Sequence, residues 1–183
     1  MFEAPGFVAD RFSIDQITAG VWYIFGCTSS YFVYLRDRSV AIEEQVRCVR
    51  GVATCYTDLF ERVCCNRGVD PDLELFEQSE IDGAVYMMWD MDCFEGTLAH
   101  PQDNPHLIEP GLFVLESALM RCRTSTCRVS ALHGIGHLYS RFEDEKDPLA
   151  DRLRELVDRF VASTTMPDWL AEYAACARDG YVQ

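Results

Sequence analysis

Basic residues are scarce in this chain. It has 16 lysines and arginines against 30 aspartates and glutamates, which gives a formal net charge of −14 at pH 7. Proteins that bind nucleic acid need clustered lysine and arginine side chains to contact the phosphates. The charge therefore argues against a nucleic-acid partner. It permits a basic protein partner, whose approach a negative field would accelerate.

Long hydrophobic runs are also missing. No apolar stretch reaches the roughly 18–20 residues that a membrane-spanning helix needs. The N-terminal residues 1–6 lack the basic segment followed by an apolar one that marks a signal peptide. We therefore expect a soluble, cytoplasmic protein with no membrane partner. The 183 residues are 49% hydrophobic, which suffices for a single domain with a full core.

Common catalytic motifs are absent as well. The chain contains no G-x-S-x-G elbow, no phosphate-binding glycine loop and no H-E-x-x-H pair, so it lacks the usual marks of a hydrolase, a nucleotide enzyme or a zinc peptidase. Cysteine, in contrast, is abundant, with nine residues. Because their number is odd and no signal peptide is indicated, we interpret most of them as buried thiols, among them Cys48, Cys55, Cys64 and Cys176.

No segment has a convincing strand pattern, and the sequence predicts an all-α fold. The strongest helical signal runs from Ile42 to Val63, where apolar residues recur at steps of four and three. Gly51 either divides this segment into a helical hairpin or lies within one long helix. Ser13 and Gln16 predict a capping box at the start of an earlier helix. Residues 31–35 are interpreted as an extended or helical connector, and residues 96–110 as the longest irregular segment.

Five further helices are expected towards the C-terminus. One should run from Ser79 or Glu80 to about Cys93, and the next should begin at Glu109-Pro110. Another, capped by Thr124, Ser125 or Thr126, should contain the segment S-A-L-H-G-I-G-H. The last two should begin at Asp147-Pro148 and at Pro167, the final one ending at Gly180 as a C′ glycine.

Two segments of the chain echo each other. Residues 16–25 align with residues 80–89, with isoleucine at 17 and 81 and valine at 21 and 85. A duplicated three-helix unit would explain this similarity, and so would chance likeness between two buried helices. We therefore expect one all-α domain, residues 1–183, with a possible internal repeat at 14–66 and 79–140 followed by helices within 147–180.

Residues 108–180, with short helices joined by turns at Pro110, Pro148 and Pro167, resemble the HEAT-like α-solenoid families. The segment S-A-L-H-G-I-G-H is also similar to one in small, uncharacterised bacterial helical proteins. The resemblance implies a helical bundle or a short solenoid of antiparallel helix pairs. It also implies a role in protein binding, because HEAT-like proteins are mostly scaffolds and inhibitors.

The segment containing His133 and His137 is the main candidate for chemistry, because on a helix the two side chains share a face one turn apart. With Cys122 and Cys127 they form the pattern C-x4-C-x5-H-x3-H, which could bind zinc although its middle gap is short. A second possibility combines the two histidines with a carboxylate from elsewhere, either Asp90 or Asp92.

A packing role competes with the metal hypothesis. Gly134 and Gly136 each cost a helix about 1 kcal/mol relative to alanine, and such glycines usually mark the close approach of another backbone. On this interpretation the histidines lie at the edge of the core and hydrogen-bond to a neighbouring helix or loop. Substitution of either glycine by valine should then be badly tolerated.

Acidic residues are concentrated in one part of the chain. From Arg67 to Ser117 there is one basic residue, Arg67, against twelve acidic ones. This stretch is either a solvated acidic face or a docking surface for a basic partner. Its candidate contacts are six carboxylates: Asp70, Asp72, Glu74, Glu77, Asp90 and Asp92.

The sequence leaves two functional hypotheses. The first is a non-enzymatic, cofactor-free binding module, specifically an acidic inhibitor or immunity-type protein for a basic partner. The second is a metal-dependent enzyme, with zinc held by His133 and His137 in a pocket beside the loop 96–108. That loop would contribute four polar side chains: His100, Asp103, Asn104 and His106.

Overall fold

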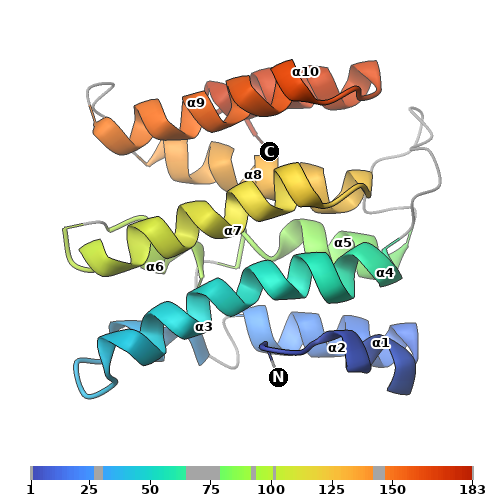
Figure 1. Cartoon of the computed structure of the whole chain (residues 1–183), viewed down its shortest axis with the longest axis vertical. Helices are drawn as coiled ribbons and strands as arrows, with labels where there is room; N and C mark the ends of the chain where they lie inside the picture. The colour runs from blue at the N-terminus through green and yellow to red at the C-terminus, as the bar shows by residue number, and fades with distance from the viewer. Residues whose placement is uncertain are drawn as a thin grey trace.

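Helices make up the fold. The computed structural model describes residues 2–26, 31–64, 79–91, 94–100, 102–141 and 147–182. These segments contain helices and turns but no strand, which confirms the all-α prediction. The helices lie roughly side by side and stack in layers from the N-terminal end to the C-terminal end (Figure 1). Within the described segments, no helix is long and apolar enough to span a bilayer.

The N-terminal layer consists of α1 (Gly6–Arg11), α2 (Ile14–Phe25) and the 3-10 helix η1 (Tyr31–Arg36). The capping box of α2 is present as predicted. The backbone N–H of Gln16 donates to Ser13 Oγ at 3.3 Å, and the N–H of Ser13 donates to Gln16 Oε1 at 3.1 Å. The connector of residues 31–35 is helical.

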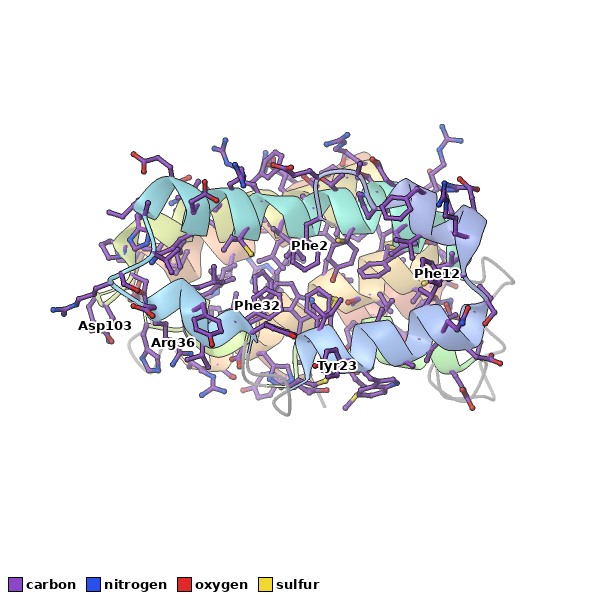
Figure 2. All side chains as sticks on the ribbon, turned by 90° about the horizontal axis from the view of Figure 1, so that it is seen from below. Phe2, Phe12, Tyr23, Phe32, Arg36 and Asp103 are labelled. Carbon is purple, nitrogen blue, oxygen red and sulfur yellow. The ribbon has the colours of Figure 1, made fainter. Side chains whose placement is uncertain are left out.

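The predicted helix from Ile42 to Val63 is one continuous helical run. It comprises α3 (Ile42–Thr54), the π-helical turn η2 (Cys55–Phe60) and α4 (Glu61–Val63). Gly51 does not break it. The glycine instead makes room for Phe2, because a Cβ at position 51 would lie 2.7 Å from Phe2 Cβ. Figure 2 shows Phe2 between α3 and the N-terminal helices, close to Phe32.

The remaining helices are α5 (Glu80–Met87), α6 (Glu95–Leu98), η4 (Pro105–Leu107), α7 (Ile108–Arg121), α8 (Ser125–Ser140), α9 (Pro148–Ser163) and α10 (Asp168–Arg178). Helix α5 ends well before the expected Cys93, so Asp90 lies in the turn that follows it. The segment expected to be irregular contains α6 and η4. The predicted start of α9 is confirmed, because the Asp147 side chain accepts from Leu149 N at 2.8 Å. The prediction that Gly180 ends the last helix as a C′ glycine is also confirmed, because its φ is 77°.

Helix α8 forms the centre of the molecule. It packs against α5, α7, α9 and α10, and eleven of its 16 residues are buried. A Cβ on Gly134 would lie 2.4 Å from the Trp89 ring, and one on Gly136 would lie 2.5 Å from Val182 Cγ1. The glycines therefore mark close approach, as predicted, but they admit side chains where we expected a neighbouring backbone.

The cysteine interpretation holds in part. Cys55 and Cys64 are buried, and so are Cys122 and Cys127. Cys48 is half-buried, and Cys176 is exposed on the outer face of α10, so the expectation that Cys176 is buried is wrong. Burial raises the pKa of the Cys55 thiol to about 12, so this side chain behaves as a small apolar residue.

Candidate metal centre

Three potential metal ligands converge in the core: Asp90, His133 and His137. Asp90 Oδ1 lies 3.0 Å from His133 Nε2 and 2.7 Å from His137 Nε2. The two Nε2 atoms are 3.1 Å apart. The structure thus brings together the histidine pair and one of the two carboxylates that the sequence offered as a third ligand. The other, Asp92, lies outside the described residues.

Trp89 brings Asp90 to the histidines. Its ring lies against Gly134, in the space that a side chain at that position would fill. The indole Nε1–H donates to the Tyr56 hydroxyl at 2.9 Å, and that hydroxyl lies 2.8 Å from Ser130 Oγ. Trp89 is therefore anchored to α8 between Ser130 and Gly134, and the next residue, Asp90, is placed beside His133.

A second hydrogen bond ties α5 to α8 at the same place. Ser130 Oγ donates to the backbone oxygen of Val85 at 2.6 Å. Ser130 and Gly134 are one helical turn apart, and His133 and His137 follow on the adjoining face of α8. One face of α8 therefore fixes the end of α5, and the neighbouring face supplies the two imidazoles. The packing role and the ligand role, which we treated as alternatives, coexist on this helix.

Hydrogen bonds can satisfy the three converging atoms in one way. With Asp90 ionised, its oxygen only accepts, and both Nε2–H groups can donate to it, which brings the two nitrogens within 3.1 Å of each other. A cation between the three atoms is the alternative, because all three lone pairs then point at positive charge.

The dimensions of the triangle fit a metal ion. With ligand bonds of about 2.0–2.2 Å, neighbouring ligand atoms lie about 2.8–3.1 Å apart on an octahedron and about 3.3–3.6 Å apart on a tetrahedron. The three observed separations, 2.7, 3.0 and 3.1 Å, match one face of an octahedron. Two histidines and one carboxylate on such a face form the ligand set of non-haem Fe(II) sites.

A tyrosine pair orients the buried histidine. His133 Nδ1 lies 2.7 Å from the Tyr173 hydroxyl, which lies 2.9 Å from the Tyr86 hydroxyl. If Nδ1–H donates to Tyr173, the Nε2 lone pair of His133 is free to bind a metal, as is usual for histidine ligands. Burial raises the pKa of Tyr173, so its hydroxyl keeps the proton that it can donate to Tyr86.

The charge state of the site also suits a metal. The His133 side chain is fully buried, whereas those of Asp90 and His137 are 23% and 28% exposed. Burial lowers the pKa of the His133 imidazole, and Asp90 opposes this effect only in part. His133 is thus neutral at pH 7, which is the form that binds metals. The exposed edge of the site lies on the side of Asp90 and His137.

The predicted cysteines do not join the histidines. Cys122 and Cys127 form a separate group with Glu61, in which the ligand atoms lie within 4.8 Å of one another. Cys127 is in α8 itself, six residues before His133, which separates them by about 9 Å along the axis. The four-ligand set C-x4-C-x5-H-x3-H is therefore not assembled, because the helix begins too early for Cys127 to fold back.

The other candidate residues lie elsewhere. His106 Nε2 contacts Gln45 Oε1 at 2.6 Å, and His100 is exposed. Asp103 lies at one end of the molecule (Figure 2). The loop 96–108 therefore contributes no ligand to the group of Asp90 and the two histidines. Four of the proposed docking carboxylates, Asp70, Asp72, Glu74 and Glu77, lie outside the described residues.

Sequence reasoning missed the tyrosines. Tyr86 and Tyr173 come from α5 and α10, and nothing in their spacing relates them to His133. Tyr86 was visible only as the counterpart of Trp22 in the echo of residues 16–25. Comparison with known proteins adds nothing to these assignments, since no family model, no curated protein and no solved structure matches the chain.

Proposed function

We propose that the protein binds one divalent transition-metal ion through Asp90, His133 and His137. The observation that supports this most directly is the three-way contact of their ligand atoms, whose separations match one face of an octahedron. Fe(II) and Mn(II) fit the triangle better than zinc, the metal of the alternative hypothesis from the sequence, because zinc prefers tetrahedral sites.

The site supports a metal-dependent enzyme better than a structural metal. Three protein ligands leave coordination positions for water and substrate, and Asp90 lines a groove between α2 and α5. A bound ion would supply Lewis acidity or activate water. Asp90 and the histidines would hold it, Tyr173 would orient His133, and the surrounding core would keep the buried side dry.

Metal titration tests this proposal. Protein stripped with a chelator should bind about one equivalent of Mn(II) or Fe(II) in calorimetry. Asp90→Asn, which preserves shape, should weaken binding at least 100-fold, and His137→Ala should do the same. Cobalt(II) should give the weak visible absorption of an octahedral site.

A matched control is His100→Ala, which removes an exposed histidine distant from the site. It should leave affinity and stoichiometry unchanged. The proposal fails if wild type binds no better than Asp90→Asn, or if loss of His100 has the same effect as loss of His137. If the cobalt(II) spectrum is that of a tetrahedral site, the proposed ligands stand, but zinc is then preferred over Fe(II) and Mn(II).

Protein binding is a second candidate function. Its support is a set of exposed aromatic side chains in the N-terminal layer, each between 43% and 60% exposed: Phe7, Phe12, Trp22, Tyr23, Tyr31 and Tyr34. Such patches often mark interaction sites, and the charge of −14 favours a basic partner. A pull-down tests this inhibitor-type role. It should capture a basic protein that is released as the salt concentration rises, and Tyr31→Ser and Tyr34→Ser should abolish the capture. If both variants capture the protein as wild type does, this surface is excluded as the binding site.

The layered helices are also compatible with a short HEAT-like solenoid built from a duplicated unit. Helices α2 and α5, which carry the echoed residues, pack side by side, as equivalent helices of successive repeats do. Separate expression of residues 1–66 tests the idea. If these residues remain unfolded alone, as an isolated repeat should, the proposal gains support; if they fold cooperatively, they are an independent domain.

A further inference from the structure

A groove between α2 and α5 leads to the proposed metal centre. It has a volume of ≈ 710 Å³ and is shared with the site through Asp90 and Tyr86. The two helices run in the same direction, because Gly26 at the end of α2 lies against Met91, which follows α5. The first turns of both helices therefore lie at one end of the groove and Asp90 lies at the other.

The floor of the groove is apolar and aromatic, formed mainly by Trp22, Tyr86 and Met87. Trp22 is 43% exposed, although the helix that carries it is otherwise well packed through Ile17, Val21 and Phe25. An indole face left open in a concave surface attracts both aliphatic groups and cations.

Carboxylates stand at both ends of this floor. Asp15 and Glu80 lie in the first turns of α2 and α5, and Asp90 lies beside the histidines. No lysine or arginine is among the described residues that line the groove. At the helical rise of 1.5 Å per residue, the ten-residue step from Glu80 to Asp90 corresponds to about 15 Å. The groove thus presents two negative ends separated by an apolar middle.

From this arrangement we infer that the groove binds a linear aliphatic amine, with ammonium groups at the carboxylates and the methylene stem over Trp22 and Tyr86. Charge complementarity selects a cation, and the spacing selects an elongated one. The inference does not depend on the proposed metal function, since the contacts come from the protein alone. If both hold, the metal ion and one ammonium group compete for Asp90.

A peptide fits this groove less well. Its backbone amides would need hydrogen-bond partners, and the neutral polar groups along the groove are already engaged. Thr18 Oγ1 donates to Ile14 O at 2.9 Å, and the Tyr86 hydroxyl pairs with Tyr173. An aliphatic amine has no amides to satisfy and matches the uncharged floor.

Calorimetry of metal-free protein with spermine tests the inference. Trp22→Ala should weaken binding about fivefold to tenfold through loss of the aromatic surface. Glu80→Gln should weaken it about tenfold through loss of one charge contact. The matched controls are Tyr23→Ala, an exposed aromatic on α2 that does not line the groove, and Glu172→Gln, an exposed carboxylate on α10. Both should bind spermine as wild type does.

The shape of the ligand provides a second test. Putrescine, which is too short to reach both ends, should bind at least tenfold more weakly than spermine, and magnesium should compete poorly. The inference is wrong if the control variants weaken binding as much as the groove variants, or if magnesium displaces spermine at equal concentration. It is also wrong if a lysine-rich peptide binds more tightly than spermine and depends on Trp22. Loss of metal binding with intact spermine binding would contradict only the proposed metal function.

Discussion

Helix α8 contributes to two groups of side chains that are common metal ligands, and they differ in one physical respect. Near its start, Cys127 and the preceding Cys122 meet Glu61; in its second half, His133 and His137 meet Asp90. Both groups are compact enough to hold an ion. They differ in what their acceptor atoms already bind.

In the cysteine group the acceptors are satisfied. The Glu61 carboxylate accepts from the backbone N–H groups of Arg123 and Thr124 and from Thr124 Oγ1, at 2.9–3.0 Å. It thereby fixes the backbone just before α8. Thr124 is the N-cap residue, as one of our alternatives had it, but its side chain accepts from no N–H group of the helix. The hydrogen bond with Cys127 and burial raise the pKa of the Cys122 thiol.

The histidine group has a different character. Its two Nε2 atoms and one carboxylate oxygen lie within 3.1 Å of one another, and two of its side chains reach solvent. The comparison indicates that residue type alone does not distinguish a metal site from a group that fixes the backbone. The distinction lies in whether the ligand atoms are held by backbone N–H groups or contact one another at an edge open to solvent.

The largest effect is expected from Gly134→Val. Its side chain would collide with the Trp89 ring, which the structure places 2.4 Å from a Cβ at this position. We expect a loss of about 3 kcal/mol or more in the free energy of unfolding, because the indole must be displaced from its position in a close-packed core. Because Asp90 follows Trp89, metal binding should be lost even at temperatures where the protein remains folded.

Urea unfolding and metal titration measure these effects. Gly20→Ala is the matched control, because a Cβ there meets nothing within 4 Å and alanine favours the helix by up to about 1 kcal/mol. Wild-type stability in Gly134→Val would contradict the close contact between Gly134 and Trp89. Reduced stability with unchanged metal affinity would show that Asp90 does not depend on Trp89.

Tyr173→Phe should have the next largest effect and should act on the histidine group alone. It removes the hydroxyl 2.7 Å from His133 Nδ1 while keeping most of the ring. Loss of such a partner typically weakens metal binding 10-fold to 100-fold. Calorimetry with Mn(II) measures the change. Tyr181→Phe, an exposed tyrosine near the C-terminus, is the control, and equal affinities in the two variants would exclude an orienting role for Tyr173.

The sequence was informative where local chemistry decides the structure. The capping box at Ser13, the helix start at Asp147 and the turn at Gly180 follow from short-range hydrogen bonding and backbone preference, and they were predicted correctly. The long run from Ile42 was predicted as well, but its π-helical turn and the exposure of Ile42 were not. Those depend on what packs against the helix.

The candidate site was only half visible in the sequence. The spacing of His133 and His137 follows from helix geometry, and Asp90 could be named only as one of two carboxylates. Its selection depends on the early end of α5 and on Trp89 lying against Gly134, a contact between residues 45 positions apart. The contributions of Tyr173 and Glu61 are likewise tertiary, because no local pattern relates either residue to α8.

Glu61→Ala should lower the free energy of unfolding and leave the metal affinity unchanged. It leaves two backbone N–H groups at the start of α8 without their acceptor, which should cost about 1–2 kcal/mol. Thermal unfolding measures the stability, and Mn(II) titration measures the metal affinity. Glu172→Ala, which removes an exposed carboxylate from α10, should change neither. If Glu61→Ala lowered metal affinity as strongly as Asp90→Asn, the two groups on α8 would not be independent.

The smallest effect concerns the reactivity of the cysteines. Thiolates rather than thiols react with iodoacetamide, and burial raises the pKa of Cys55 to about 12, far above a working pH of 8. The pKa of Cys122 is raised in the same direction. Cys176, which is exposed on α10, should therefore be alkylated at least 100-fold faster than Cys55 or Cys122 in the folded protein, and urea should remove the difference. Peptide mass spectrometry measures each site. Fast modification of Cys122 in the native state would mean that this sulfur carries negative charge, and the cysteine group would then compete with the histidine group as a metal site.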